Sequence, residues 1–256
     1  MTVRIEKRPG AERGSRTPEK IQSLSSGAIG TVTDAVKDAA GGAIRAVKPR
    51  LRGWIHAFTA PLALAACIVL TVLAPGPALT WACAAYLACS LFLFANSGVY
   101  HISYGHWPRR VTAVLQRVDH ANIYLLIAGT YTPLSVALLD RGMTLLVLGI
   151  VWGGALAGII TSLAWRSAPR WLTTLFYILL GWVAIWFLPQ FWMTGGPAIV
   201  WLLVSGGVTY TVGGVVYARR WPDPDPRWFG FHEIFHTCTV AAWACQCTAC
   251  YLAVLG

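Results

Sequence analysis

The chain has 256 residues, of which 56% are hydrophobic and only 12% are charged, and its formal net charge is +10. This composition excludes an ordinary soluble globular domain and is typical of a polytopic helical membrane protein. The positive charge lies in loops and in an N-terminal tail rather than on one folded surface, so we expect no nucleic-acid partner. We therefore expect an all-α, multi-pass protein of the plasma membrane.

The N-terminal region, residues 1–52, differs in composition from the rest of the chain. Its opening, from Met1 to Gly14, is charged and lacks an apolar core, so we expect no cleavable signal peptide. Between Ile21 and Val47 apolar residues recur at helical spacing, flanked by lysine and arginine, although several glycines disfavour a helix there. The region is therefore either a disordered tail or an amphipathic helix that lies on the anionic inner leaflet.

The remainder, residues 53–256, contains seven apolar stretches, each close to the ~20 residues that a bilayer core requires. We place these stretches at about 54–74, 79–101, 118–138, 143–163, 171–190, 197–218 and 230–254. Turn-forming residues break three of the connections, at Pro75–Pro77, Asp140–Gly142 and Thr194–Gly196. The sequence thus predicts a bundle of seven transmembrane helices.

Small residues are also placed with a helical spacing. The fourth stretch carries two pairs of glycines four residues apart, Gly149/Gly153 and Gly154/Gly158, which let helix backbones approach closely in a membrane. All seven cysteines lie in apolar stretches, where a thiol behaves as a small hydrophobic group. We expect neither a disulfide framework nor a thiolate metal site.

Basic residues orient the bundle. If the N-terminus is inside, the tail and the even-numbered connections together place 19 of the 20 lysines and arginines on the cytoplasmic side. Arg141 alone is then outside. Because cytoplasmic loops carry an excess of lysine and arginine, we expect a cytoplasmic N-terminus, an external C-terminus and an odd number of spans.

Polar residues gather at the cytoplasmic ends of three predicted helices. His232 and His236 are four residues apart and share one face of the last helix, and Ser97 and His101 have the same spacing on the second. Asp119 lies in the first turn of the third helix at the same level. Ionisable groups at this depth indicate a functional site. Three imidazoles and one water form the tetrahedral arrangement of a hydrolytic zinc site, with a carboxylate as proton acceptor.

Alternatives exist for several members of this group, and a lone His101 beside Tyr100 would be an interfacial residue near the headgroups. His232–His236 also fits the H-E-x-x-H pattern of zinc metalloproteases, in which Glu233 would be the general base, but no downstream third ligand of that class is present. Asp119 has Arg110 and Arg117 as alternative partners. The other histidines are expected at the membrane interface, His106 and His120, or as a weak candidate ligand on the first helix, His56.

Three stretches resemble the hemolysin III family, the bacterial branch of the progestin and adiponectin receptor superfamily. They are Ser97–His101, Leu115–Tyr124 running into Ala128–Pro133, and Gly230–His236. The resemblance covers residues from about 53 to 256 and implies a seven-helix bundle. It also implies zinc held by His101, His232 and His236, with Ser97 and Asp119 beside it; Asp119 rather than Glu233 would activate the zinc-bound water.

The resemblance leads to three functional hypotheses. The first is a zinc-dependent hydrolase of a membrane lipid amide or ester, with membrane lipids as its partners and a role in lipid homeostasis. The second is a non-catalytic sensor or receptor-like protein in which zinc is structural and the site is closed by four ligands. The third is a pore-forming cytolysin, which would need a continuous polar stripe across several helices.

Overall fold

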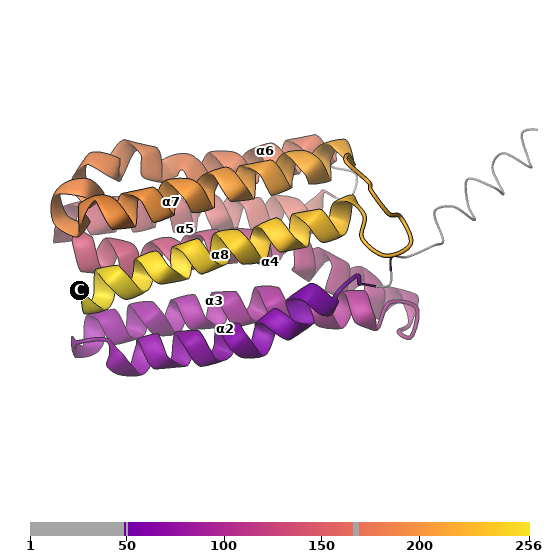
Figure 1. Ribbon diagram of the computed structural model, residues 1–256, viewed down its shortest axis with the longest axis horizontal. Coiled ribbons are helices and arrows are strands. Elements are labelled where there is room, and N and C mark those ends of the chain that lie inside the picture. The colour runs from indigo at the N-terminus through magenta and orange to yellow at the C-terminus, as the bar shows by residue number, and fades with distance from the viewer. Residues whose placement is uncertain (1–48, 50, 166–168) are drawn as a thin grey trace, which may run out of the picture. The chain divides into compact units, whose positions relative to one another are not determined.

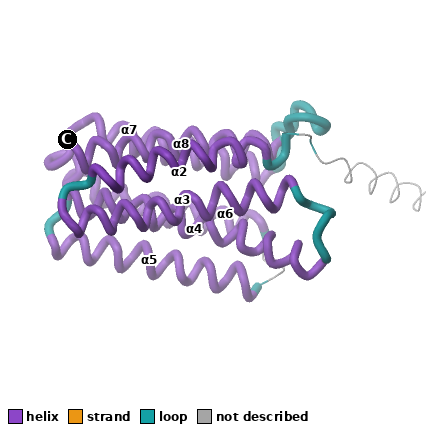
Figure 2. Tube along the Cα trace, turned by 90° about the horizontal axis from the view of Figure 1, so that it is seen from below, coloured by secondary structure: helices purple, strands orange, loops and turns teal. Residues whose placement is uncertain are grey.

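The computed structural model of the protein describes residues 49, 51–165 and 169–256. Within these ranges the chain is a bundle of long helices that run alongside one another (Figures 1 and 2). The elements are α2 (Trp54–Leu73), α3 (Gly76–Ile102), α4 (Arg109–Leu138), α5 (Arg141–Ala164), α6 (Arg170–Gly181), the 3₁₀ helix η1 (Trp182–Phe187), α7 (Leu188–Arg219) and α8 (Phe231–Leu255). The predicted tail, residues 1–52, lies almost entirely outside the described residues.

The predicted turns separate the helices where expected. α2 ends at Leu73 and α3 begins at Gly76, with a proline in its first turn. The side chain of Asp140 accepts hydrogen bonds from the backbone N–H groups of Gly142 and Met143 and so caps α5. The connection between α2 and α3 and the connection between α4 and α5 are each two residues long.

One predicted boundary was wrong. α4 begins at Arg109, nine residues before the expected start at 118, so Asp119 lies in its third turn rather than its first. The first ten residues of α4 are rich in polar side chains, and an apolar pattern therefore does not reveal them as helix. Asp119 nevertheless lies beside the end of α3, as described below.

Among the described residues, six helical ranges are long and apolar enough to cross a membrane, and one of these is the 50-residue range Arg170–Arg219. Gly196 interrupts this range with φ 77° and ψ 176°. The segments before and after Gly196 contact each other, since the indole N–H of Trp182 in η1 donates to the hydroxyl of Thr211 in α7 at 2.9 Å. This hairpin favours the predicted division into two spans near Gly195–Gly196, while the count of seven and the sides of the termini stay predictions.

Close helix contacts occur at only one of the two predicted glycine pairs. A Cβ at Gly154 would meet Leu180 at 2.7 Å, and one at Gly158 would meet the ring of Tyr124. Gly149 and Gly153 have nothing within 4 Å of such a Cβ among the described residues, so the expected close approach at this pair was wrong. Those two glycines lie on the outer face of α5.

Candidate metal centre

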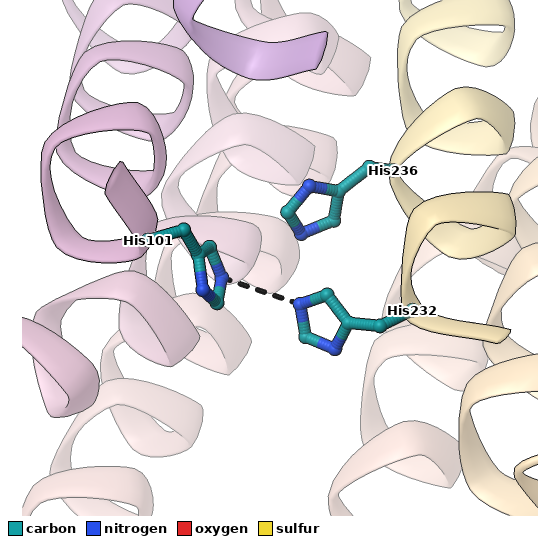
Figure 3. Close-up of side chains that lie close together, drawn as sticks. All are labelled: His101, His232 and His236. Atoms are coloured by element: carbon teal, nitrogen blue, oxygen red, sulfur yellow. Dashed lines mark hydrogen bonds between the residues drawn. The ribbon is translucent and has the colours of Figure 1, made fainter. Parts of the chain in front are cut away.

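Three histidines from two helices meet at one end of the bundle (Figure 3). His101 lies in the last turn of α3, and His232 and His236 lie in the first two turns of α8. One ring nitrogen from each lies within 4.8 Å of the others. The Nε2 atoms of His101 and His232 are only 3.2 Å apart. The spacing of four residues gives His232 and His236 a common face, as the sequence predicted.

This cluster fits a zinc ion. His101 and His236 are buried, with 6% and 2% of their surface exposed. Among the described residues, Nδ1 of His236 has no hydrogen-bond partner. When the other ring nitrogen binds an ion, Nδ1 is the second ring nitrogen of His236, and within the described chain the ring then has no hydrogen bond that fixes its orientation. Three neutral imidazoles are also the ligand set of hydrolytic zinc sites with one open position.

Ser97 and Asp119 border the same cluster. Oδ2 of Asp119 lies 3.5 Å from Nε2 of His101, the nitrogen that also faces His232. Ser97, one turn before His101 on α3, is 2% exposed and lies beside the Asp119 carboxylate. No ion pair of Asp119 with Arg110 or Arg117 occurs in the described part of the chain. The structure therefore brings the five predicted site residues together, and their chemical roles stay predictions.

Comparison with known proteins identifies the family of this chain. The family model described as "Haemolysin-III related" matches residues 44–247. The chain belongs to the haemolysin III family. Together with its long apolar helices, this makes it a multi-pass protein of the cell membrane.

Two curated relatives of this haemolysin III family member come from Bacillus. The chain is 32% identical over 142 residues to the "Hemolysin-3 homolog" of Bacillus subtilis (strain 168), covering 55% of this chain and 65% of the relative. It is 35% identical over 114 residues to "Hemolysin-3" of Bacillus cereus, covering 44% of this chain and 51% of the relative. In both comparisons the match spans less than two thirds of the relative's length.

Glu233 does not face the histidines. Its Oε2 accepts a hydrogen bond from the backbone N–H of Gly230, and its Oε1 forms an ion pair with Nε of Arg52, each at 2.9 Å. The side chain is completely buried and both oxygens are engaged. Glu233 therefore stabilises the start of α8, which argues against the metalloprotease reading of the H-E-x-x-H pattern.

Sequence reasoning gave His56 too little weight. Its ring is 3% exposed and lies parallel to that of His236, with centroids 3.9 Å apart and an interplanar angle of 6°. His106 and His120, by contrast, do not belong to the group of three converging histidines: His106 is exposed in the loop after α3, and His120 is half-buried on α4. Its depth was the available signal, because His56 lies in the first turn of α2, at the end predicted to be cytoplasmic like the ends that carry the other site residues.

Proposed function

We propose that this haemolysin III family member is a membrane-embedded, zinc-dependent hydrolase that cleaves an amide or ester bond of a membrane lipid. In this role it contributes to membrane lipid homeostasis. The proposal rests on one observation above all, an apolar cavity that begins one helical turn from the candidate metal centre. A lipid chain in this cavity would bring the bond that joins it to the headgroup close to the histidines.

The cavity lies among α3, α4, α6, η1, α7 and α8, has a volume of about 110 Å³ and is partly open to the surface. Its walls are mostly leucine, isoleucine and aromatic side chains. Three lining residues stand one turn from site residues on the same helices: Leu93 from Ser97, Ile123 from Asp119 and Phe235 from His232. One helical turn rises about 5.4 Å, so the cavity and the site are adjacent.

Each site residue has its own role in the proposed hydrolysis. His101, His232 and His236 would hold the zinc, which when bound polarises a carbonyl oxygen and favours ionisation of water. Asp119 accepts a proton from the attacking water and returns it to the leaving amine or alcohol. Ser97 donates its hydroxyl hydrogen toward the developing oxyanion. The net reaction adds one water across a C–N or C–O bond and releases a fatty acid.

Mass spectrometry of lipid products tests this proposal. The zinc-supplemented protein is incubated in nanodiscs with a ceramide or an ester lipid, beside Asp119→Asn. A matched control is Asp140→Asn, at the cap of α5. We expect Asp119→Asn to keep its zinc and to release fatty acid at least ~100-fold more slowly, while Asp140→Asn turns over like the wild type.

Two results would contradict the hydrolase. Equal turnover by the wild type and Asp119→Asn would remove Asp119 from the reaction. A wild-type protein that holds zinc with no exchangeable water and releases no fatty acid from any lipid supplied would favour the non-catalytic sensor instead.

A further inference from the structure

The start of α2 contacts both helices that carry the histidines. Its first link is the ion pair between Arg52 and Glu233, 181 positions apart in sequence. Glu233 stands between His232 and His236 in α8 and has no exposed side-chain surface. A buried carboxylate that loses its partner is strongly destabilising. The pair therefore holds the first turn of α8 at a fixed distance from the start of α2.

The second link is a close approach of backbone to α3. Gly53 has φ +89°, and a Cβ there would lie 2.7 Å from Cβ of His101 and 3.0 Å from the backbone nitrogen of Ile102. One turn further along α2, Ala57 packs against Gly98, where a Cβ would lie 3.1 Å from Cα of Ala57. The same segment that binds α8 through Arg52 thus rests directly on the turn that carries His101.

The third link is the stacked pair of His56 and His236. His56 also packs edge-on against Phe94 of α3, with ring centroids 5.2 Å apart. It does not belong to the group of three histidines whose nitrogens converge. A metal-binding histidine is normally oriented by a hydrogen bond from its second ring nitrogen. Nδ1 of His236 has no such partner in the described part of the chain, so the stacked ring of His56 can fix its plane instead.

We propose that the segment from Arg52 through the first two turns of α2 positions the histidine cluster, with Arg52 and His56 as positioning residues for His232 and His236. The inference deepens the proposed function, because it rests on a metal centre at these histidines. In this arrangement Arg52 fixes the position of the first turn of α8. Gly53 allows the chain before α2 to lie against the α3 turn that carries His101, and His56 fixes the plane of the His236 ring. Neither Arg52 nor His56 is a ligand.

Metal affinity and a spectroscopic readout test the positioning role in the purified full-length protein. Zinc affinity is measured by competition with a chelator, and Co²⁺ loading reports ligand geometry through its visible absorption bands. The variants are Arg52→Ala and Arg52→Lys, and His56→Ala and His56→Phe. Arg227→Ala is the matched control, since it removes a positive charge in the loop before α8 without touching the cluster.

We expect Arg52→Ala and His56→Ala to weaken zinc binding by ~10–100-fold and to change the Co²⁺ spectrum. Arg52→Lys keeps a charge for Glu233 and His56→Phe keeps a flat ring against His236, so both should recover most of the affinity. Arg227→Ala should bind like the wild type. If Arg52→Ala does not fold, Arg52→Gln compared with Arg52→Lys gives the same contrast.

Three results would overturn the inference. The first is wild-type affinity and spectra in both alanine variants. The second is an equal loss of affinity in Arg227→Ala. The third is complete loss of metal in His56→Phe, which would make His56 a ligand. Absence of metal from the wild-type protein is a separate result, and it would refute the proposed centre itself together with this inference.

Discussion

The carboxylate of Asp119 on α4 and the imidazole of His101 on α3 lie 3.5 Å apart, at the same ring nitrogen that faces His232. The other nearby carboxylate, that of Glu233, is turned away and bound to Arg52. Two acidic groups within a few turns of the histidines therefore have different surroundings. On the basis of this difference we propose proton transfer at Asp119 and a structural role for Glu233.

Substitution of each carboxylate by its amide should separate these roles. We expect Glu233→Gln to raise the zinc Kd by about tenfold, because the start of α8 loses its ion pair. At saturating zinc it should turn over at least ~100-fold faster than Asp119→Asn. Zinc titration and initial rates measure both quantities. The opposite order of rates would make Glu233 the general base.

The apolar cavity predicts a dependence on lipid chain length. Gly207 lines the cavity, and a Cβ there would meet Trp182 only at an ordinary contact distance of 3.7 Å. Gly207→Leu should therefore fill part of the cavity and raise KM for long-chain lipids by about tenfold, with a smaller effect on short chains. The matched control, Gly153→Leu, adds the same side chain where nothing lies within 4 Å. Equal effects of both variants would exclude the cavity as the lipid site.

The effect of the backbone conformation of Gly53 can be separated from the effect of its contact with His101. Gly53 and Gly105 both have positive φ, +89° and +90°, but a Cβ at Gly105 meets nothing within 4 Å. Both alanine variants should lose about 1 kcal/mol of stability through backbone strain. Only Gly53→Ala should also weaken zinc binding, since its methyl group would displace the last turn of α3. Thermal unfolding and zinc titration distinguish the two effects, and equal zinc affinities would contradict the contact.

Much of the site could be predicted because it depends on local spacing. The intervals His232–His236 and Ser97–His101 fix which residues share a helical face, whatever the helix packs against. The orientation of Glu233 could not be predicted in this way, since Arg52 determines it from 181 positions away. The outer position of Gly149 and Gly153 could not be predicted for another reason. Lipid and the protein interior are equally apolar, so hydrophobicity does not distinguish the two faces of α5.

The orientation of the bundle has its own test. One additional cysteine is introduced in place of either Arg227 or Gly256. Each variant is treated in intact cells with a membrane-impermeant maleimide. The charge distribution predicts that the Gly256→Cys variant is labelled from outside, while Arg227→Cys reacts only after the membrane is opened. The wild-type protein, whose seven cysteines all lie within helices, is the control. Labelling of Arg227→Cys alone in intact cells would reverse the predicted topology.

The most direct test of a zinc centre at the three histidines is the metal content of the purified protein. Wild type, His236→Ala and the loop variant His106→Ala are supplemented with zinc, dialysed and measured by elemental mass spectrometry. We expect about one zinc per chain in the wild type and in His106→Ala, and loss of that zinc in His236→Ala. A wild-type protein without stoichiometric metal, or a His236→Ala variant that retains it, would contradict a zinc centre at the three histidines.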